Sequence, residues 1–125
     1  MNCALSEPSL VRLAKVFKLL SEPNRLRILR CLGTDCRPVS DILRDTGLEQ
    51  TNASFHLRIL REAGLVRAER RGPFIYYCVH DTSLWVHLKR LDHWVTAATS
   101  PGRLARGNGA TRTRDARDYP ALKEA

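Results

Sequence analysis

The feature that most constrains this chain is a change of hydrophobic spacing near its centre. Between residues 39 and 63 the apolar residues recur at helical spacing, whereas between residues 65 and 79 they alternate as in strands. Gly47 separates two helical stretches, and the cationic segment Arg70-Arg71-Gly72-Pro73 separates two alternating ones. The region therefore predicts a short helix, a tight turn, a second helix from about residue 50 to residue 63, and a β-hairpin.

The second of these helices has one apolar and one polar face. Ala53, Leu57 and Leu60 share the apolar face and are expected to pack on a core. The other face carries side chains that hydrogen-bond base edges or phosphates, and the hairpin tip adds two cations. The expected DNA-contacting residues are Gln50, Thr51, Asn52, Ser54, His56, Arg58, Arg70 and Arg71.

Three further amphipathic helices flank this region. The first covers residues 9 to 20. The second starts at Ser21, a capping residue followed by Glu22 and Pro23, and stops at Gly33. The last follows Asp81 or Thr82 as cap and ends near Ala98. The predicted fold is mostly α, with five helices and a two-stranded β-hairpin wing.

Length and charge bound the organisation of the chain. Its 125 residues suffice for one sizeable core, and its net charge of +8 favours a polyanion or an acidic surface as partner. Residues 99–125 hold six basic and three acidic residues but few bulky apolar ones, which predicts a disordered basic tail. We assign residues 1–8 to an N-terminal arm and residues 9–98 to the folded domain.

The chain shows neither a long apolar run nor a secretory leader. A membrane span needs about 20 apolar residues, and no run approaches that length. We therefore expect a cytoplasmic protein without a membrane partner. In a reducing compartment its four cysteines are expected to be free thiols or metal or redox ligands rather than structural disulfides: Cys3, Cys31, Cys36 and Cys78.

Helices, turn, recognition helix and wing in this order predict a winged helix-turn-helix. Four segments resemble the ArsR/SmtB-type repressors: LSEPNRLRIL (20–29), VSDIL (39–43), NASFHLRILREAGLV (52–66) and RRGPFIYY (70–77). The likeness covers about residues 10–98. It implies a homodimeric repressor that releases double-stranded operator DNA when an effector binds. It also implies a dimer interface on the first and last helices, here Leu13, Val16, Phe17, Trp85, Leu88, Leu91 and Trp94.

The same resemblance implies effector sites from which this sequence departs. Family members use a Cys-x-Cys pair near the third helix, often with an N-terminal cysteine, whereas here Cys36 is followed by Arg37-Pro38-Val39-Ser40. Cys3, Cys31 and Cys36 have the ligand type for a thiophilic metal or arsenite. A redox couple between Cys31 and Cys36 is a further interpretation, and so is the absence of any chemistry at these thiols. The cofactor therefore stays unknown.

The last helix and the wing contain other metal-ligating residue types. Asp81, His87, Asp92 and His93 fit the family's paired site on the last helix poorly, and we interpret them as a solvated face. Cys78 alternates with aromatic residues along the second wing strand, which indicates packing rather than chemistry.

Other classes of function are less consistent with these patterns. Ser54 and His56 are two residues apart on a helix and face different directions, so they form no nucleophile and base pair, and we expect no enzyme. A regulator without an effector, or a protein-interaction module on the same fold, are the alternatives. The outward polar face and the basic hairpin tip favour DNA binding.

Overall fold

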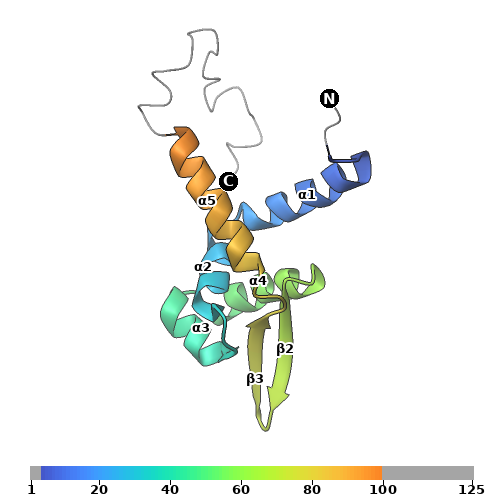
Figure 1. The fold of residues 1–125 in the computed structure, drawn as a ribbon. Helices are drawn as coiled ribbons and strands as arrows, with labels where there is room; N and C mark the ends of the chain where they lie inside the picture. The colour runs from blue at the N-terminus through green and yellow to red at the C-terminus, as the bar shows by residue number, and fades with distance from the viewer. Residues whose placement is uncertain (1–3, 100–125) are drawn as a thin grey trace. The chain divides into compact units, whose positions relative to one another are not determined.

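A computed structural model of the chain describes residues 4–99. The predicted tail, beyond its first residue, and Cys3 lie outside the described residues. The chain divides into two compact units, Met1–Thr82 and Ser83–Ala125, which we describe separately. The described part contains α1 (Glu7–Leu20), α2 (Pro23–Leu32), β1 (Arg37–Pro38), α3 (Val39–Thr46), α4 (Gln50–Glu62), β2 (Val66–Arg71), β3 (Phe74–Val79) and α5 (Leu84–Thr99) (Figure 1).

The core of the first unit lies where α2, α3 and α4 meet the sheet. Its large, fully buried side chains are all aliphatic, and each contributes about 1.5–3 kcal/mol by its burial. The predicted apolar face of α4 is confirmed, because Ala53, Leu57 and Leu60 are all buried. The other large members are Ile28, Leu29, Leu32 and Ile42. This packing anchors α4 by one face and leaves the opposite face outside the core.

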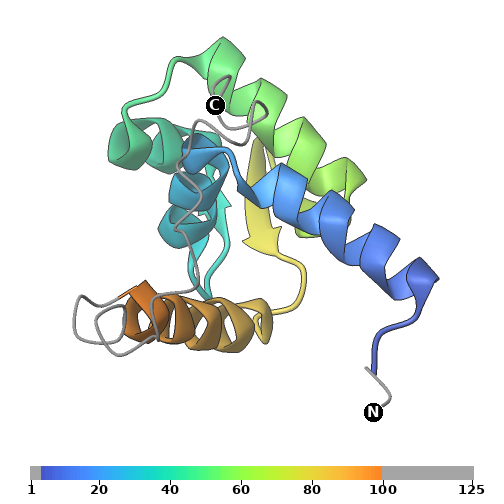
Figure 2. The same cartoon turned by 90° about the horizontal axis from the view of Figure 1, so that it is seen from above.

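The turn between α3 and α4 forms at Gly47, as the sequence predicts. Gly47 has a φ of 71°, in the left-handed region, and its amide donates to the carbonyl of Leu43 at 2.9 Å. The Thr46 hydroxyl donates to the Ile42 carbonyl and accepts from the amide of Leu48. These bonds hold the chain in the sharp reversal that joins the two helices (Figure 2).

The helix starts near the N-terminus differ from the prediction. α1 begins at Glu7 because the Ser6 hydroxyl accepts from the amide of Ser9 at 3.3 Å. Ser21 does not cap α2, since its hydroxyl donates to the carbonyl of Lys18 at the end of α1. The cap of α2 is instead the Glu22 carboxylate, which accepts from the amide of Asn24 at 3.1 Å.

The β-hairpin is present and belongs to a larger sheet than predicted. β2 and β3 pair from Val66↔Val79 to Arg71↔Phe74, so Arg70 and Arg71 end β2 and Gly72-Pro73 forms the turn. The sheet has a third strand, β1, and its order is β1-β3-β2. Two residues are too few to show periodicity, so the sequence did not reveal β1. Figure 1 shows the hairpin extending from the helices of this unit, which completes a winged helix-turn-helix.

The first and last helices expose much of their apolar surface. α1 buries only Leu20, and α5 buries none of its residues. α5 begins after Ser83, whose carbonyl accepts from the amides of Val86 and His87, rather than after Asp81 or Thr82. Every residue predicted for the dimer interface is exposed or half-exposed: Leu13, Val16, Phe17, Trp85, Leu88, Leu91 and Trp94. None of the described helices is both long and apolar enough to cross a membrane.

Candidate nucleic-acid interface

The outward face of α4 carries the predicted base-contacting side chains. Of the six α4 residues predicted to contact DNA, His56 is partly buried. The other five are exposed: Gln50, Thr51, Asn52, Ser54 and Arg58. The N-cap residue, Glu49, makes no side-chain bond to the helix, so the first amides of α4 remain available to water or a phosphate. Short polar side chains at the N-terminal end of a firmly packed helix are what reading a major groove requires.

Phe55 is an exposed residue of this face that the prediction omitted. With Gln50, Thr51, Ser54 and Arg58 it lines a shallow hollow on the surface of α4. Phe55 is 47% exposed, and the Arg58 guanidinium lies 5.7 Å from the centroid of its ring. The spacing of Thr51, Phe55 and Arg58 places all three on one helix face and could have identified it. An exposed aromatic ring can contact a thymine methyl group or the sugar backbone.

His56 belongs to a bond network that joins α4 to α2. Its Nδ1 accepts from the Nε of Arg25 at 3.2 Å, and the Arg25 Nη1 donates to the Leu19 carbonyl at 3.1 Å. Partial burial, and then the charge of Arg25, lower the pKa of His56 below its ordinary value. The ring is therefore neutral near pH 7, and its proton is assigned to Nε2. A phosphate contact by His56 stays a prediction and would use that nitrogen.

The two cations of the hairpin tip lie in different environments. Arg71 donates to the Glu69 carboxylate at 2.9 Å and lies over the Tyr76 ring, 4.5 Å from its centroid. Hydrogen bonds from Arg67 and then Arg71 lower the pKa of Glu69. Arg70 is exposed, and within the part of the chain that the structure describes it makes no ion pair. Arg70 is therefore the tip cation that is free to meet a phosphate.

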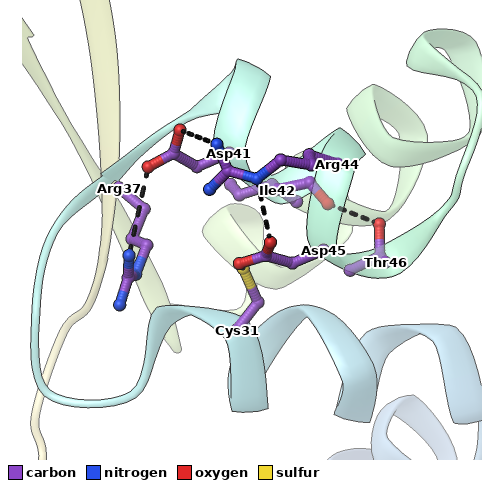
Figure 3. Close-up of polar contacts among 7 residues, drawn as sticks. All are labelled: Cys31, Arg37, Asp41, Ile42, Arg44, Asp45 and Thr46. Atoms are coloured by element: carbon purple, nitrogen blue, oxygen red, sulfur yellow. Dashed lines mark hydrogen bonds and ion pairs between the residues drawn. The ribbon is translucent and has the colours of Figure 1, made fainter.

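A chain of polar contacts connects α2 to α3 (Figure 3). Asp41 lies 4.0 Å from Arg37 and 3.4 Å from Arg44, whose Nε donates to Asp45 at 3.2 Å. The other carboxylate oxygen of Asp45 accepts from the Cys31 thiol at 3.6 Å. Partial burial, followed by the charge of Asp45, raises the pKa of Cys31. Cys31 is therefore held as a protonated, weakly nucleophilic thiol.

Cys36 and Cys78 form a disulfide, with their Cα atoms 4.3 Å apart. The prediction that Cys78 serves in packing alone is thus wrong, although the residue is buried. The expectation that the cysteines form no disulfide is wrong for Cys36 and Cys78, and Cys36 is not coupled to Cys31, which is a free thiol. Sequence reasoning missed the pair because it arises from the pairing of β1 with β3, which has no local pattern.

Of the predicted thiol trio, Cys36 is bonded to Cys78, Cys31 is a free thiol, and Cys3 lies outside the described residues. Among the described residues, the group with metal-ligating atoms close enough for an ion is Cys36, Glu69 and Cys78, whose atoms lie within 4.8 Å of one another. Cys31 contacts Asp45 instead, as described above. On α5 and before it, the residues with metal-ligating side chains are all exposed: Asp81, His87, Asp92 and His93.

Comparison with known proteins shows that the helix-turn-helix region is similar to transcriptional regulators. A helix-turn-helix domain family model matches residues 20–69. The HTH-type transcriptional regulator NmtR of Mycobacterium tuberculosis is 37% identical over 65% of this chain and 68% of its own length. The cadmium resistance transcriptional regulatory protein CadC homolog of Staphylococcus aureus is 31% identical over 70% of this chain and 69% of its own length. The chain thus spans about two thirds of each relative.

A similar solved structure extends the likeness to the whole fold. The homodimeric winged helix-turn-helix DNA-binding domain of Mb0332 from Mycobacterium bovis, a possible ArsR-family transcriptional regulator, is 28% identical to this chain. Its solution structure matches with a TM-score of 0.62, over 80% of this chain and 97% of that one. The match therefore reaches well beyond the helix-turn-helix that the family model covers.

Proposed function

Because the chain belongs to the ArsR/SmtB-type winged helix-turn-helix transcriptional regulators, we propose that it binds double-stranded operator DNA as a homodimeric repressor. The family consists of transcriptional regulators, so the chain is not an enzyme. One observation carries the proposal of DNA binding. α4 buries Ala53, Leu57 and Leu60 and exposes a row of base-compatible side chains beside a basic hairpin.

The proposed binding mode divides the surface between bases and backbone. Gln50, Thr51, Asn52 and Ser54 stand in the first turns of α4, where a recognition helix meets base edges in the major groove. Arg58 and Arg70 are placed for phosphates, which fix the register of the protein without reading sequence. Arg71 contributes less because Glu69 neutralises part of its charge.

The apolar surfaces of α1 and α5 support a dimer of this chain. Phe17 is 52% exposed and Trp94 is 62% exposed, and large aromatic side chains of this kind commonly anchor interfaces. We propose that the predicted residues on the two helices meet their counterparts in a second copy. Two recognition helices would then fit half-sites separated by about 34–36 Å, one turn of DNA.

We also propose that the repressor acts in the cytoplasm and responds to a thiophilic metal or to oxidation through Cys36. A relative is named for cadmium resistance, and the sulfur atoms of Cys36 and Cys78 with a Glu69 oxygen form a group of suitable atoms here. That group fits an ion only after the disulfide is reduced and Glu69 leaves its arginines. Cys31 and Cys3 stay proposed partners of Cys36. A regulator without an effector is the second candidate.

Selection of bound duplexes from a random pool tests the proposed function. Affinity for the selected duplex should exceed affinity for a scrambled one by about 10³-fold or more at physiological salt. Both affinities should fall steeply as salt is raised, because phosphate contacts release counterions. Equal affinity for both duplexes would instead favour a protein-interaction module on the same fold.

A further inference from the structure

Backbone pairing places Cys36 beside Cys78. β1 and β3 are antiparallel, with Arg37 opposite Tyr77 and Pro38 opposite Tyr76, so the residue before Arg37 stands opposite Cys78. Their Cα separation of 4.3 Å is close to the roughly 4.5 Å of a directly opposed, non-hydrogen-bonded pair in an antiparallel ladder. Because the pairing of β1 with β3 places these two residues opposite each other, we expect the two sulfur atoms to stay adjacent in the reduced protein.

A repressor works beside DNA in a compartment whose glutathione keeps most thiols reduced, so a disulfide there is rarely a permanent structural link. We propose that Cys36 and Cys78 form a reversible thiol–disulfide switch, closed by hydroperoxides and opened by glutathione or protein dithiols. The switch regulates the proposed DNA binding and rests on that function. It differs from the sequence-based hypotheses because it pairs Cys36 with a wing residue.

The two cysteines differ in access, which assigns their roles. Cys36 is half-exposed, whereas Cys78 is 3% exposed. Cys36 as thiolate therefore attacks an oxygen of hydrogen peroxide, the O–O bond breaks, and the departing hydroxide takes up the Cys36 proton to form water. Cys36 is left as a sulfenic acid. Cys78 attacks its sulfur, the S–O bond breaks, and the second hydroxide leaves as water with the Cys78 proton. Two thiols lose two electrons, and one peroxide gains them.

The charges around the pair are unfavourable for a bound cation. Glu69 is the carboxylate next to the sulfur atoms, and Arg67 and Arg71 both bind it. Arg67 also stands directly opposite Cys78 in the β2–β3 ladder. Two guanidinium groups thus offset the one carboxylate, which reduces its repulsion of a thiolate and competes with any metal for its oxygens.

The position of the bond couples it to DNA reading. β1 leads without a break into α3, the helix that supports α4, and β3 is a strand of the wing. Without the bond, two residue pairs join β1 to β3. With it, the root of the wing is covalently fixed to the helix-turn-helix. A wing fixed in this way loses less freedom when DNA binds, so the oxidised protein should bind its operator more tightly.

The test uses the full chain, hydrogen peroxide as oxidant and a duplex selected as described above. Peptide mapping identifies the bonded cysteines, and operator affinity is measured in the peroxide-treated and glutathione-treated states. We expect a Cys36–Cys78 bond, reversed by glutathione, and operator affinity about five-fold or more tighter in the oxidised state.

Variants identify the cysteines involved. Cys36→Ser and Cys78→Ser should show no difference in operator affinity between the two states. Cys31→Ser tests the other described candidate partner of Cys36 and should keep both the Cys36–Cys78 bond and the difference in affinity between the two states. Cys78→Ala replaces Cys78→Ser if serine is not tolerated at this buried site.

Each contrary outcome has a definite meaning. A bond that does not form, that involves Cys31, or that survives excess reduced glutathione overturns the switch while leaving operator binding intact. Equal affinities in the two states, or weaker binding after oxidation, overturn the inference that the disulfide strengthens DNA binding by fixing the wing. A bond that forms reversibly in a protein that selects no duplex in either state overturns the proposed function and, with it, this regulation.

Discussion

At the scale of residues, we propose that exposed side chains of α4 read bases and that a cation at the wing tip contacts the DNA backbone. Asn52 and Ser54 are exposed near the start of α4, where side chains meet base edges. Arg70 is exposed at the end of β2, while Arg71 is held by Glu69 and the Tyr76 ring. We therefore propose that Arg70, rather than Arg71, makes the first phosphate contact of the wing.

Loss of a base contact and loss of a phosphate contact should have different effects. Asn52→Ala should reduce discrimination between the selected and scrambled duplexes by about 1–3 kcal/mol, the size of one good base contact. Arg70→Ala should weaken both duplexes alike and lower the salt slope by about 0.9 for one phosphate contact. Anisotropy titrations at several salt concentrations measure both. Arg90→Ala on α5 removes the same charge elsewhere and is the control. Equal loss of specificity from Asn52→Ala and Arg70→Ala would contradict the proposal that the first contacts a base and the second a phosphate.

His56 should make stability depend on pH. Its pKa in the folded chain lies below the unfolded value of about 6.5, so the unfolded state binds more protons between the two values. Stability therefore rises with pH in that window, is fully present above it, and is lost as pH falls through it. Melting temperatures between pH 5.5 and 7.5 should show this trend for the unmodified protein and for His87→Gln. The trend should shrink in His56→Gln, and an unchanged trend there would assign it to another group.

At the scale of elements, the reversal between α3 and α4 determines how the recognition helix is presented. Gly47 has a φ of 71°, and a Cβ there would meet no atom within 4 Å. The conformation alone, and not crowding, therefore opposes a side chain at this position. The neighbouring bonds of Thr46 hold the same reversal from the α3 side.

Gly47→Ala should destabilise the fold by about 1–2 kcal/mol, the cost of a left-handed residue with a Cβ. Urea unfolding monitored by circular dichroism measures it. Gly47→Asn should cost less, because asparagine tolerates this region better than alanine. Equal costs for the two variants would contradict an origin in the left-handed turn, because the lower entropy of the unfolded chain stabilises both variants rather than destabilising them.

At the scale of the whole molecule, unburied apolar surface on α1 and α5 predicts association. Sedimentation at micromolar concentration should show twice the mass of the chain. Phe17→Glu and Trp94→Glu should each shift the equilibrium toward monomers by placing a charge in an apolar contact. Ile75→Glu, an exposed apolar position in the wing, is the matched control and should leave the dimer intact. A monomer at all concentrations would contradict the two half-site binding mode.

Local patterns determined much of this protein, because helices and hairpins repeat a geometry that shows in nearby residues. The spacing of Ala53, Leu57 and Leu60 predicted both the buried face of α4 and its outward polar face. Gly47 and the segment Gly72-Pro73 marked the two turns. The resemblance added the family, which comparison with known proteins confirms.

Tertiary structure alone decided the contacts between distant segments. Arg25 bonds to His56 from 31 residues away, and Cys36 meets Cys78 from 42 residues away. Both depend on how elements pack and on strand register, neither of which leaves a periodic trace in the sequence. β1, with its two residues, could be recognised only from its pairing with β3. The sequence thus determined which side chains face outward, and packing decided which of them are already bound to a neighbour.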